Sequence, residues 1–124
     1  MSTEDPRFAG VARLYGIEGL DRLKAAHVAI VGVGGVGSWA AEAIARCGVG
    51  EISLFDLDDV CVSNSNRQLH ALDSTVGKPK VEVMAERLRG INPDCTVQSG
   101  LIPRRRSAIT STLGLPTVLS SACN

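Results

Sequence analysis

The sequence has few aromatic side chains and no excess of charge of either sign. Aromatic residues make up 3% of its 124 residues, and 13 Lys and Arg side chains balance 13 Asp and Glu side chains. A core built from this composition is aliphatic and rich in alanine. A net charge of zero removes the general electrostatic case for a protein that binds nucleic acid or a membrane surface through its overall charge.

Long apolar runs and closely spaced cysteine pairs are also missing. No run approaches the roughly 20 apolar residues of a membrane span, so no membrane partner is expected. The four cysteines form no C-x-x-C pair, and neither a metal site nor a disulfide framework is expected. Hydrophobic residues at 44% and charged residues at 21% are ordinary values for a globular chain. The length leaves room for one small domain.

Short apolar segments and glycine-rich turns predict alternating strands and helices. Residues 28–31 and 52–55 are apolar runs typical of strands that are buried on both faces of a parallel sheet. Between them, residues 38–47 repeat apolar side chains at helical spacing. The remaining expectations are an irregular arm at 1–18, helices at 19–26 and 79–91, and a strand at 96–101. The pattern predicts an α/β fold, a Rossmann-like parallel sheet with flanking helices.

The turn after the first expected strand fits the G-x-G-x-x-G pattern through Gly32, Gly34 and Gly37. In nucleotide-binding βαβ units these glycines permit the tight turn, the approach of a phosphate to the backbone, and close packing of helix on strand. The helix that follows directs unpaired N–H groups and its positive dipole end at an anion. Asp56 ends the second strand, where a carboxylate can bond ribose hydroxyls. A nucleotide site is predicted, with a merely structural turn as the alternative.

Two cations beyond the second strand favour ATP over a dinucleotide. The loop at 57–77 is expected above the sheet and contains Arg67, and Lys80 follows it. An enzyme that handles the β- and γ-phosphates needs cations to neutralise and align them for attack at the α-phosphate. A dehydrogenase needs no such pair at this point. Each cation alone is more often an ordinary solvated side chain, so the interpretation rests on the set.

Four motifs carry a family resemblance: GVGGVG (32–37), DLD (56–58), NSNRQ (64–68) and VGKPK (76–80). They resemble the E1-like (ThiF/MoeB/HesA) superfamily of adenylating enzymes. Within it, the chain looks most like the bacterial tRNA threonylcarbamoyladenosine dehydratases. The blocks that carry this second likeness are 7–16, 35–50, 56–72 and 83–93. The resemblance covers about residues 7–98.

The resemblance implies an ATP- and Mg²⁺-dependent enzyme that adenylates the carboxylate of N6-threonylcarbamoyladenosine in tRNA. Loss of the activated oxygen then closes a cyclic form of the modified base. It also implies a cytoplasmic homodimer whose partners are the modified tRNA and, in sister enzymes, a sulfur-transfer or ubiquitin-like protein. The alternatives are an adenylyltransferase that acts on a ubiquitin-like sulfur carrier for thiamine or molybdopterin, an NAD(P)-binding module, and a non-enzymatic interaction domain.

Residue roles follow from the same resemblance. Arg13 would reach across the homodimer into the partner's ATP site, where a planar guanidinium suits bidentate phosphate contact. An exposed residue on a mobile arm is its alternative reading. His70 and Trp39 are expected to be structural. The residues implied at the nucleotide are Gly32, Gly34, Gly35 and Gly37 as its cradle, Asp56 on the ribose, Asp58 on the metal or ribose side, and Asn64, Arg67 and Lys80 on the phosphates. The candidate catalytic residues are Arg13, Arg67 and Lys80.

Residues 101–124 depart from the family pattern. Family members continue through further strands that bear an aspartate for the Mg²⁺ that accompanies ATP, whereas no acidic residue follows Asp94 here. The chain is therefore expected to be an inactive or nearly inactive fragment. Read one base out of frame, residues 107–113 are codon-compatible with a Gly-Asp-Tyr-Leu-Asp-Ala stretch, which predicts a reading-frame disruption. A divergent tail or a cropped chain is the alternative. The expected division is an incomplete ATP-binding domain at 1–100 and a divergent tail at 101–124.

Overall fold

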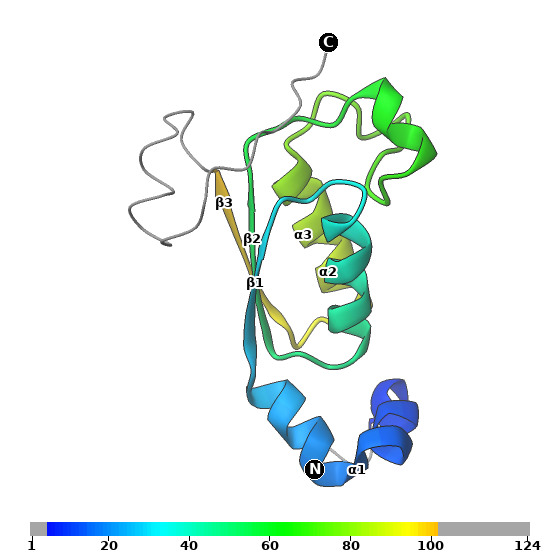
Figure 1. Cartoon of the computed structure of the whole chain (residues 1–124), viewed down its shortest axis with the longest axis vertical. Helices are drawn as coiled ribbons and strands as arrows, with labels where there is room; N and C mark the ends of the chain where they lie inside the picture. The colour runs from blue at the N-terminus through cyan, green and yellow to red at the C-terminus, as the bar shows by residue number, and fades with distance from the viewer. Residues whose placement is uncertain (1–4, 102–124) are drawn as a thin grey trace.

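The computed structural model describes residues 5–101, so the expected tail lies, beyond its first residue, outside the described residues. Three parallel strands form a sheet in the order β1-β2-β3, and helices α2 and α3 lie on the same side of it (Figure 1). The elements are η2 (Pro6–Phe8), α1 (Ala9–Ala25), β1 (His27–Val31), α2 (Gly37–Arg46), β2 (Glu51–Asp56), η3 (Val62–Asn66), α3 (Lys80–Ile91) and β3 (Thr96–Leu101). The α/β, Rossmann-like fold expected from the sequence is confirmed.

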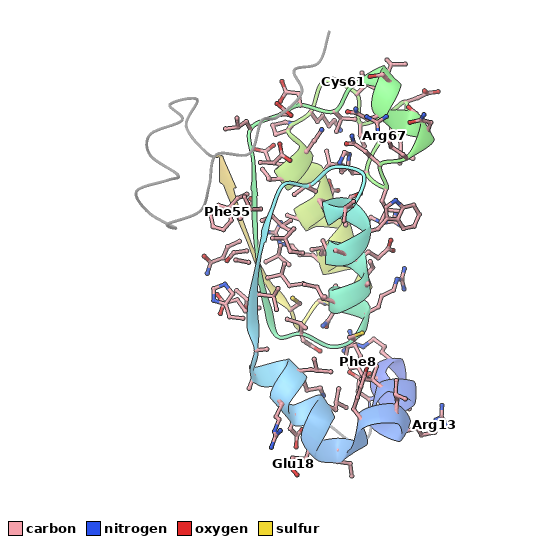
Figure 2. The ribbon with its side chains drawn as sticks, in the orientation of Figure 1. Phe8, Arg13, Glu18, Phe55, Cys61 and Arg67 are labelled. Atoms are coloured by element: carbon pink, nitrogen blue, oxygen red, sulfur yellow. The ribbon has the colours of Figure 1, made fainter. Side chains whose placement is uncertain are left out.

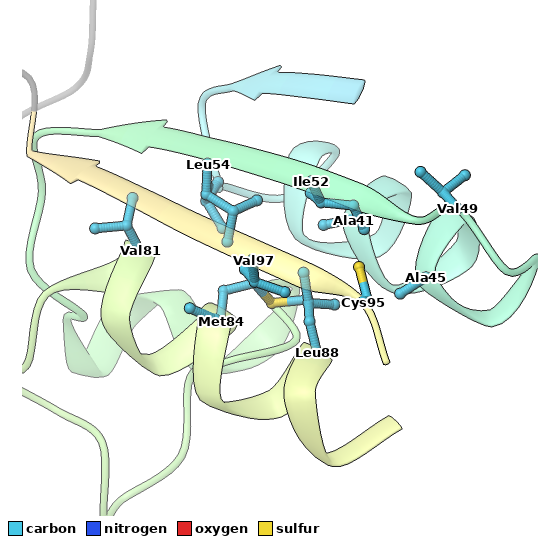
Figure 3. Close-up of a cluster of buried hydrophobic side chains, with 12 residues drawn as sticks. Ala41, Ala45, Val49, Ile52, Leu54, Val81, Met84, Leu88, Cys95 and Val97 are labelled. Atoms are coloured by element: carbon cyan, nitrogen blue, oxygen red, sulfur yellow. The ribbon is translucent and has the colours of Figure 1, made fainter. Parts of the chain in front are cut away.

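An aliphatic core joins the sheet to the two helices. Ile52 and Leu54 of β2 are fully buried against α2 and α3 (Figure 3). Alanines at the sheet-facing positions of α2 let that helix approach closely, whereas α3 fills its side with longer side chains. The other core residues are Val33, Ala41, Ala45, Val49, Val81, Met84, Ala85, Leu88, Cys95 and Val97. Among the described residues, this cluster contains no aromatic ring, as the scarcity of aromatic residues predicts.

Strand β1 differs from its expectation. Its residues alternate between exposed and partly buried, and only Val28 and Ile30 pack against the core. Within residues 5–101 β1 is an edge strand with helices on one face, so the expectation that it is buried on both faces is wrong for this part of the chain. Strand β2, which pairs on both sides, fits the continuous apolar pattern instead.

Residues 6–25 are helical, so the expectation of an irregular arm at 1–18 is wrong for the described residues 6–18. Helix α1 runs over 17 residues and is kinked at Gly16, which adopts a φ of 77°. Tertiary contacts explain why this segment is helical. Phe8 is buried, and its ring lies with Leu20 beside Gly48 at the end of α2. Arg7 forms an ion pair with Asp94 at 2.7 Å and ties the segment to the turn before β3. Such distant partners leave no local pattern in the sequence.

Two further expectations concern cysteines and membranes. Cys61 is disulfide-bonded, which contradicts the expectation of unpaired cysteines, whereas Cys47 and Cys95 are free thiols. Among residues 5–101, no helix combines the length and the apolar character that crossing a bilayer requires.

Candidate functional site

The candidate site lies where the parallel strands end at their carboxyl termini. The glycine turn follows β1, Asp56 is the last residue of β2, and the long loop that contains η3 folds over the same edge (Figure 1). Ligands of open α/β sheets bind in the crevice outside the carboxyl ends of the strands. The topology therefore gathers the sequence motifs at one edge, as the resemblance implies.

The glycine turn depends on glycine at two of its positions. Gly32 adopts a φ of 92°, a left-handed conformation that side chains disfavour, and its N–H donates to the Phe55 carbonyl at 2.8 Å. A Cβ on Gly37 would clash with the Gly32 carbonyl oxygen. The chain thus closes tightly at the start of α2, in agreement with the roles expected for the first and third glycines.

Asp56 fastens the glycine turn to the end of β2. Its Oδ2 accepts a hydrogen bond from the Val33 N–H at 2.6 Å, and its Oδ1 accepts one from the Asp58 N–H at 2.9 Å. This structural duty was not predicted from the sequence. It leaves room for the expected ribose contact, because each carboxylate oxygen has two acceptor positions.

Side chains from α2 and from the loop after η3 hold these two segments together. The Ser38 hydroxyl donates to the Gly34 carbonyl and accepts from the Leu69 N–H at 3.2 Å. The Trp39 indole N–H donates to the Arg67 carbonyl at 2.9 Å. His70 is buried and its Nε2 lies 2.7 Å from the Val33 carbonyl oxygen. The contact of His70 is structural, as expected. The link from Trp39, which is 54% exposed, to the loop was not predicted, and Ser38 had no distinguishing signal in the sequence.

The two side chains that the sequence predicts at the phosphates, Arg67 and Lys80, both lie at this edge of the sheet. The aliphatic part of Arg67 lies 3.6 Å from the Cβ position of Gly35, and its Nη1 donates to Asn66 Oδ1 at 2.9 Å (Figure 2). Lys80 begins α3, is 6% exposed, and its backbone N–H donates to the Asp58 carbonyl at 3.0 Å. Arg67 therefore flanks the glycine turn, and Lys80 flanks the acidic stretch after β2.

The charges around Asp58 and His70 act on their protonation. Burial raises the pKa of Asp58, the neighbouring Asp56 raises it further, and the Lys80 ammonium opposes both. Burial lowers the pKa of His70, and the nearby Lys80 lowers it too, against the hydrogen bond to Val33. The neutral imidazole is thus the favoured form, which suits a ring that bridges backbone segments.

Two residues predicted at the nucleotide have other positions or contacts in this structure: Asn64 bonds within its own loop, and Arg13 lies far from the glycine turn. The Asn64 Oδ1 accepts from the Cys61 N–H at 2.9 Å and caps η3, so this oxygen serves the loop. Arg13 is exposed on α1, at the opposite end of the molecule from Arg67 (Figure 2). Within one chain the structure does not bring Arg13 to the glycine turn, and its expected role in a partner's site stays a prediction.

Metal ligation has no built site in the described part of the chain. Within residues 5–101, no group of three or more His, Cys, Asp and Glu side chains is arranged to hold an ion. The residues present there do not by themselves fit a resident Mg²⁺.

Comparison with known proteins decides the family. The model of the ThiF family matches residues 8–105. The chain belongs to the ThiF family. This confirms the resemblance drawn from the glycine turn and the motifs that follow it.

Two curated relatives match similar lengths of the chain. It is 63% identical over 91 residues to the tRNA threonylcarbamoyladenosine dehydratase of Escherichia coli (strain K12), which is 73% of this chain and 34% of that protein. It is 45% identical over 87 residues to the molybdopterin-synthase adenylyltransferase of Salmonella typhimurium, which is 70% of this chain and 35% of that protein. The chain thus spans about a third of the length of these curated relatives.

A solved structure of the E. coli dehydratase in complex with ATP has the same fold. Its TM-score is 0.81 at 51% identity, and the match covers 90% of this chain and 46% of that chain. The three-stranded sheet and its helices therefore correspond to part of a protein that has been solved with ATP bound.

Proposed function

We propose that this chain carries the nucleotide-binding part of an ATP-dependent tRNA threonylcarbamoyladenosine dehydratase. The observation that carries the proposal is the edge of the sheet where the glycine turn, Asp56, Arg67 and Lys80 meet. Its likeness to a protein of that name, at 63% identity, supports the same substrate. Because the chain spans about a third of that relative, the complete reaction is proposed for a protein of the relative's length.

The chemistry follows from the charges at this edge. A carboxylate oxygen of the threonylcarbamoyl group attacks the α-phosphorus of ATP, and pyrophosphate leaves with the electron pair of the broken P–O bond. A nucleophilic atom of the carbamoyl group then attacks the activated carbonyl carbon and closes the ring, and that group loses an N–H proton. The acyl C–O bond breaks in the same step, and AMP leaves with the former carboxylate oxygen. Arg67 and Lys80 lower the barrier of the first step by neutralising the phosphate charge that would otherwise repel the incoming carboxylate. Asp56 orients the ribose, and the glycines let the phosphates approach the backbone.

Further features of the proposal rest on the family resemblance. Arg13 lies far from the glycine turn of its own chain, which suits contact with a second copy in a homodimer (Figure 2). Mg²⁺ would accompany ATP as the counter-ion of its phosphates. A cytoplasmic location would bring the protein to its tRNA substrate.

Calorimetric titration and pyrophosphate exchange test the proposal. We expect the 124-residue chain to bind ATP in preference to NAD, and we expect Arg67→Ala and Lys80→Ala to weaken binding of ATP by roughly tenfold or more each. With tRNA that carries threonylcarbamoyladenosine, the chain is expected to exchange pyrophosphate into ATP only at background. Preference for NAD, or turnover like that of a full-length relative, would contradict these expectations.

A sulfur-carrier adenylyltransferase is the second candidate. The 45% identity to a molybdopterin-synthase adenylyltransferase favours it, since the same phosphate-binding edge serves any carboxylate substrate. The substrate separates the two candidates in a protein of the relatives' full length. Stimulation of pyrophosphate exchange into ATP by the modified tRNA supports the first candidate. Formation of an acyl adenylate on a ubiquitin-like protein supports the second.

A further inference from the structure

Val33 is held from two sides by groups that come from different segments of the chain. The residue is fully buried in the glycine turn. Its N–H donates to Asp56 Oδ2 at 2.6 Å, at the end of β2. Its carbonyl oxygen lies 2.7 Å from His70 Nε2, in the loop that follows η3. Both backbone polar groups of Val33 are therefore fixed by side chains rather than by regular secondary structure.

The hydrogen bond from His70 to the Val33 carbonyl sets the direction of the Gly34 N–H. The Val33 carbonyl and the Gly34 N–H belong to one peptide unit, which is planar and trans, so the two bonds point in opposite directions. The hydrogen bond from His70 holds the carbonyl toward the buried side and thereby turns the Gly34 N–H away from it. Among residues 5–101 this N–H donates to no backbone carbonyl. A Cβ on Gly34 would meet only Gln68 Nε2, at 3.9 Å, so an approaching group has room there.

We propose that His70 is a positioning residue that aims the Gly34 N–H at a phosphate of the bound nucleotide. The proposal rests on the function proposed above and adds to it a residue that would not itself touch the ligand. A backbone N–H held in place before binding costs no reorganisation when the phosphate arrives. A merely structural histidine would instead stabilise the fold without affecting the contribution of the phosphates to binding.

The burial of His70 requires one particular form of its ring. The residue is 1% exposed, and its Nδ1 is buried without a partner in the described part of the chain. Only a proton on Nε2 lets the ring donate to the Val33 carbonyl. The charged groups that face it are Lys80, which disfavours a second proton, and Asp56, which favours one. Neutral His70 with its proton on Nε2 satisfies both the hydrogen bond and the buried surroundings.

Two substitutions separate positioning from packing. His70→Leu removes the donor, and we expect the 124-residue chain that carries it to bind ATP about tenfold or more weakly, with unchanged affinity for adenosine, which lacks phosphates. His70→Gln keeps an N–H donor and is expected to stay within about threefold of the original chain. The matched control is His27→Leu, because His27 is the only other histidine and lies on β1 with half of its side chain exposed. Equal ATP affinity in His70→Leu and the original chain would overturn the proposal.

A measurement on the unaltered chain covers the case in which His70→Leu does not fold. We expect nitrogen NMR to find the His70 proton on Nε2, and addition of ATP to shift the Gly34 amide signal downfield. A proton on Nδ1, or a Gly34 amide that ATP leaves unmoved, would contradict the positioning role. If the unaltered chain binds no ATP at all, the failure lies with the proposed nucleotide site itself.

Discussion

Gly37 and Gly90 differ in what a side chain would meet at each position. At Gly37 an added Cβ would clash with the Gly32 carbonyl oxygen and lie 2.8 Å from the Gly32 carbonyl carbon, both parts of the rigid turn. Gly90 lies near the end of α3, and an added Cβ would meet nothing within 4 Å. Steric need for glycine is therefore a property of single positions, and at Gly37 it coincides with the nucleotide motif.

The pair predicts opposite effects of the same substitution. Gly37→Ala should lower the free energy of unfolding by at least about 2 kcal/mol, since the turn must distort. Gly90→Ala should raise it by up to about 1 kcal/mol, because alanine has the higher helix propensity. Urea unfolding followed by circular dichroism measures both. Equal stability of the two variants would show that the turn does not close as tightly as described.

Helices α2 and α3 are joined by one acidic side chain. Glu42 of α2 is largely buried, and its Oε1 lies 2.8 Å from Arg46 of the same helix and 3.0 Å from Arg87 of α3. Burial pushes the pKa of Glu42 upward, but the hydrogen bonds from the two arginines together outweigh it and leave the pKa lowered. The ionised form is thus favoured in the folded state, and it fixes how the helices lie on the sheet.

Glu42→Gln tests this contact through its pH dependence. A folded-state pKa below the unfolded value of 4.5 stabilises the chain above that pH, and the stabilisation is lost as the pH falls through the lowered pKa. The variant should therefore lose about 1–3 kcal/mol near pH 7 and show a smaller further loss in acid than the original chain. Urea titrations between pH 3 and pH 7 provide the comparison. Glu86→Gln, at an exposed position of α3, is the matched control and should change little.

The molecule as a whole has a helix-covered face and an open face within residues 5–101. Helices α2 and α3 bury one side of the sheet (Figure 1), whereas Phe55 lies on the other side together with polar side chains (Figure 2). On that side His27 Nε2 lies 2.7 Å from Ser53 Oγ, and Gln98 donates to Glu51 at 2.8 Å. A sheet with one buried face derives less stability from apolar burial than one covered on both faces. Ligand binding should then contribute a large share of its total stability.

ATP should therefore stabilise the chain measurably. At a concentration one hundred times its Kd, a ligand that binds only the folded state adds about 2.7 kcal/mol. For a domain of this size that corresponds to a rise in Tm of roughly 10 °C. Thermal unfolding with ATP and with NAD at the same concentration distinguishes the nucleotides. A larger shift with NAD than with ATP would contradict the proposed site.

The extent of sequence-based prediction varied with how local each feature was. Helices α2 and α3 and all three strands were predicted close to their observed bounds, because their apolar spacing and their glycine or proline limits lie within the segments. The part of α1 before residue 19 was missed, since Phe8 and Arg7 obtain partners from residues tens of positions away. In the site, Arg67 and the glycines could be identified by motif, but the links made by Ser38 and His70 could not.

By itself, the sequence determined the alternation of strand, turn and helix, the aliphatic core and the family to which the chain belongs. These features depend on side-chain period and on short motifs, which are complete within a few residues. Only the tertiary structure decided that Asp56 and His70 hold the two polar groups of Val33, and that Arg13 lies away from the glycine turn. Such contacts depend on how the strands align and on where the long loop folds, and no local stretch of sequence contains that information.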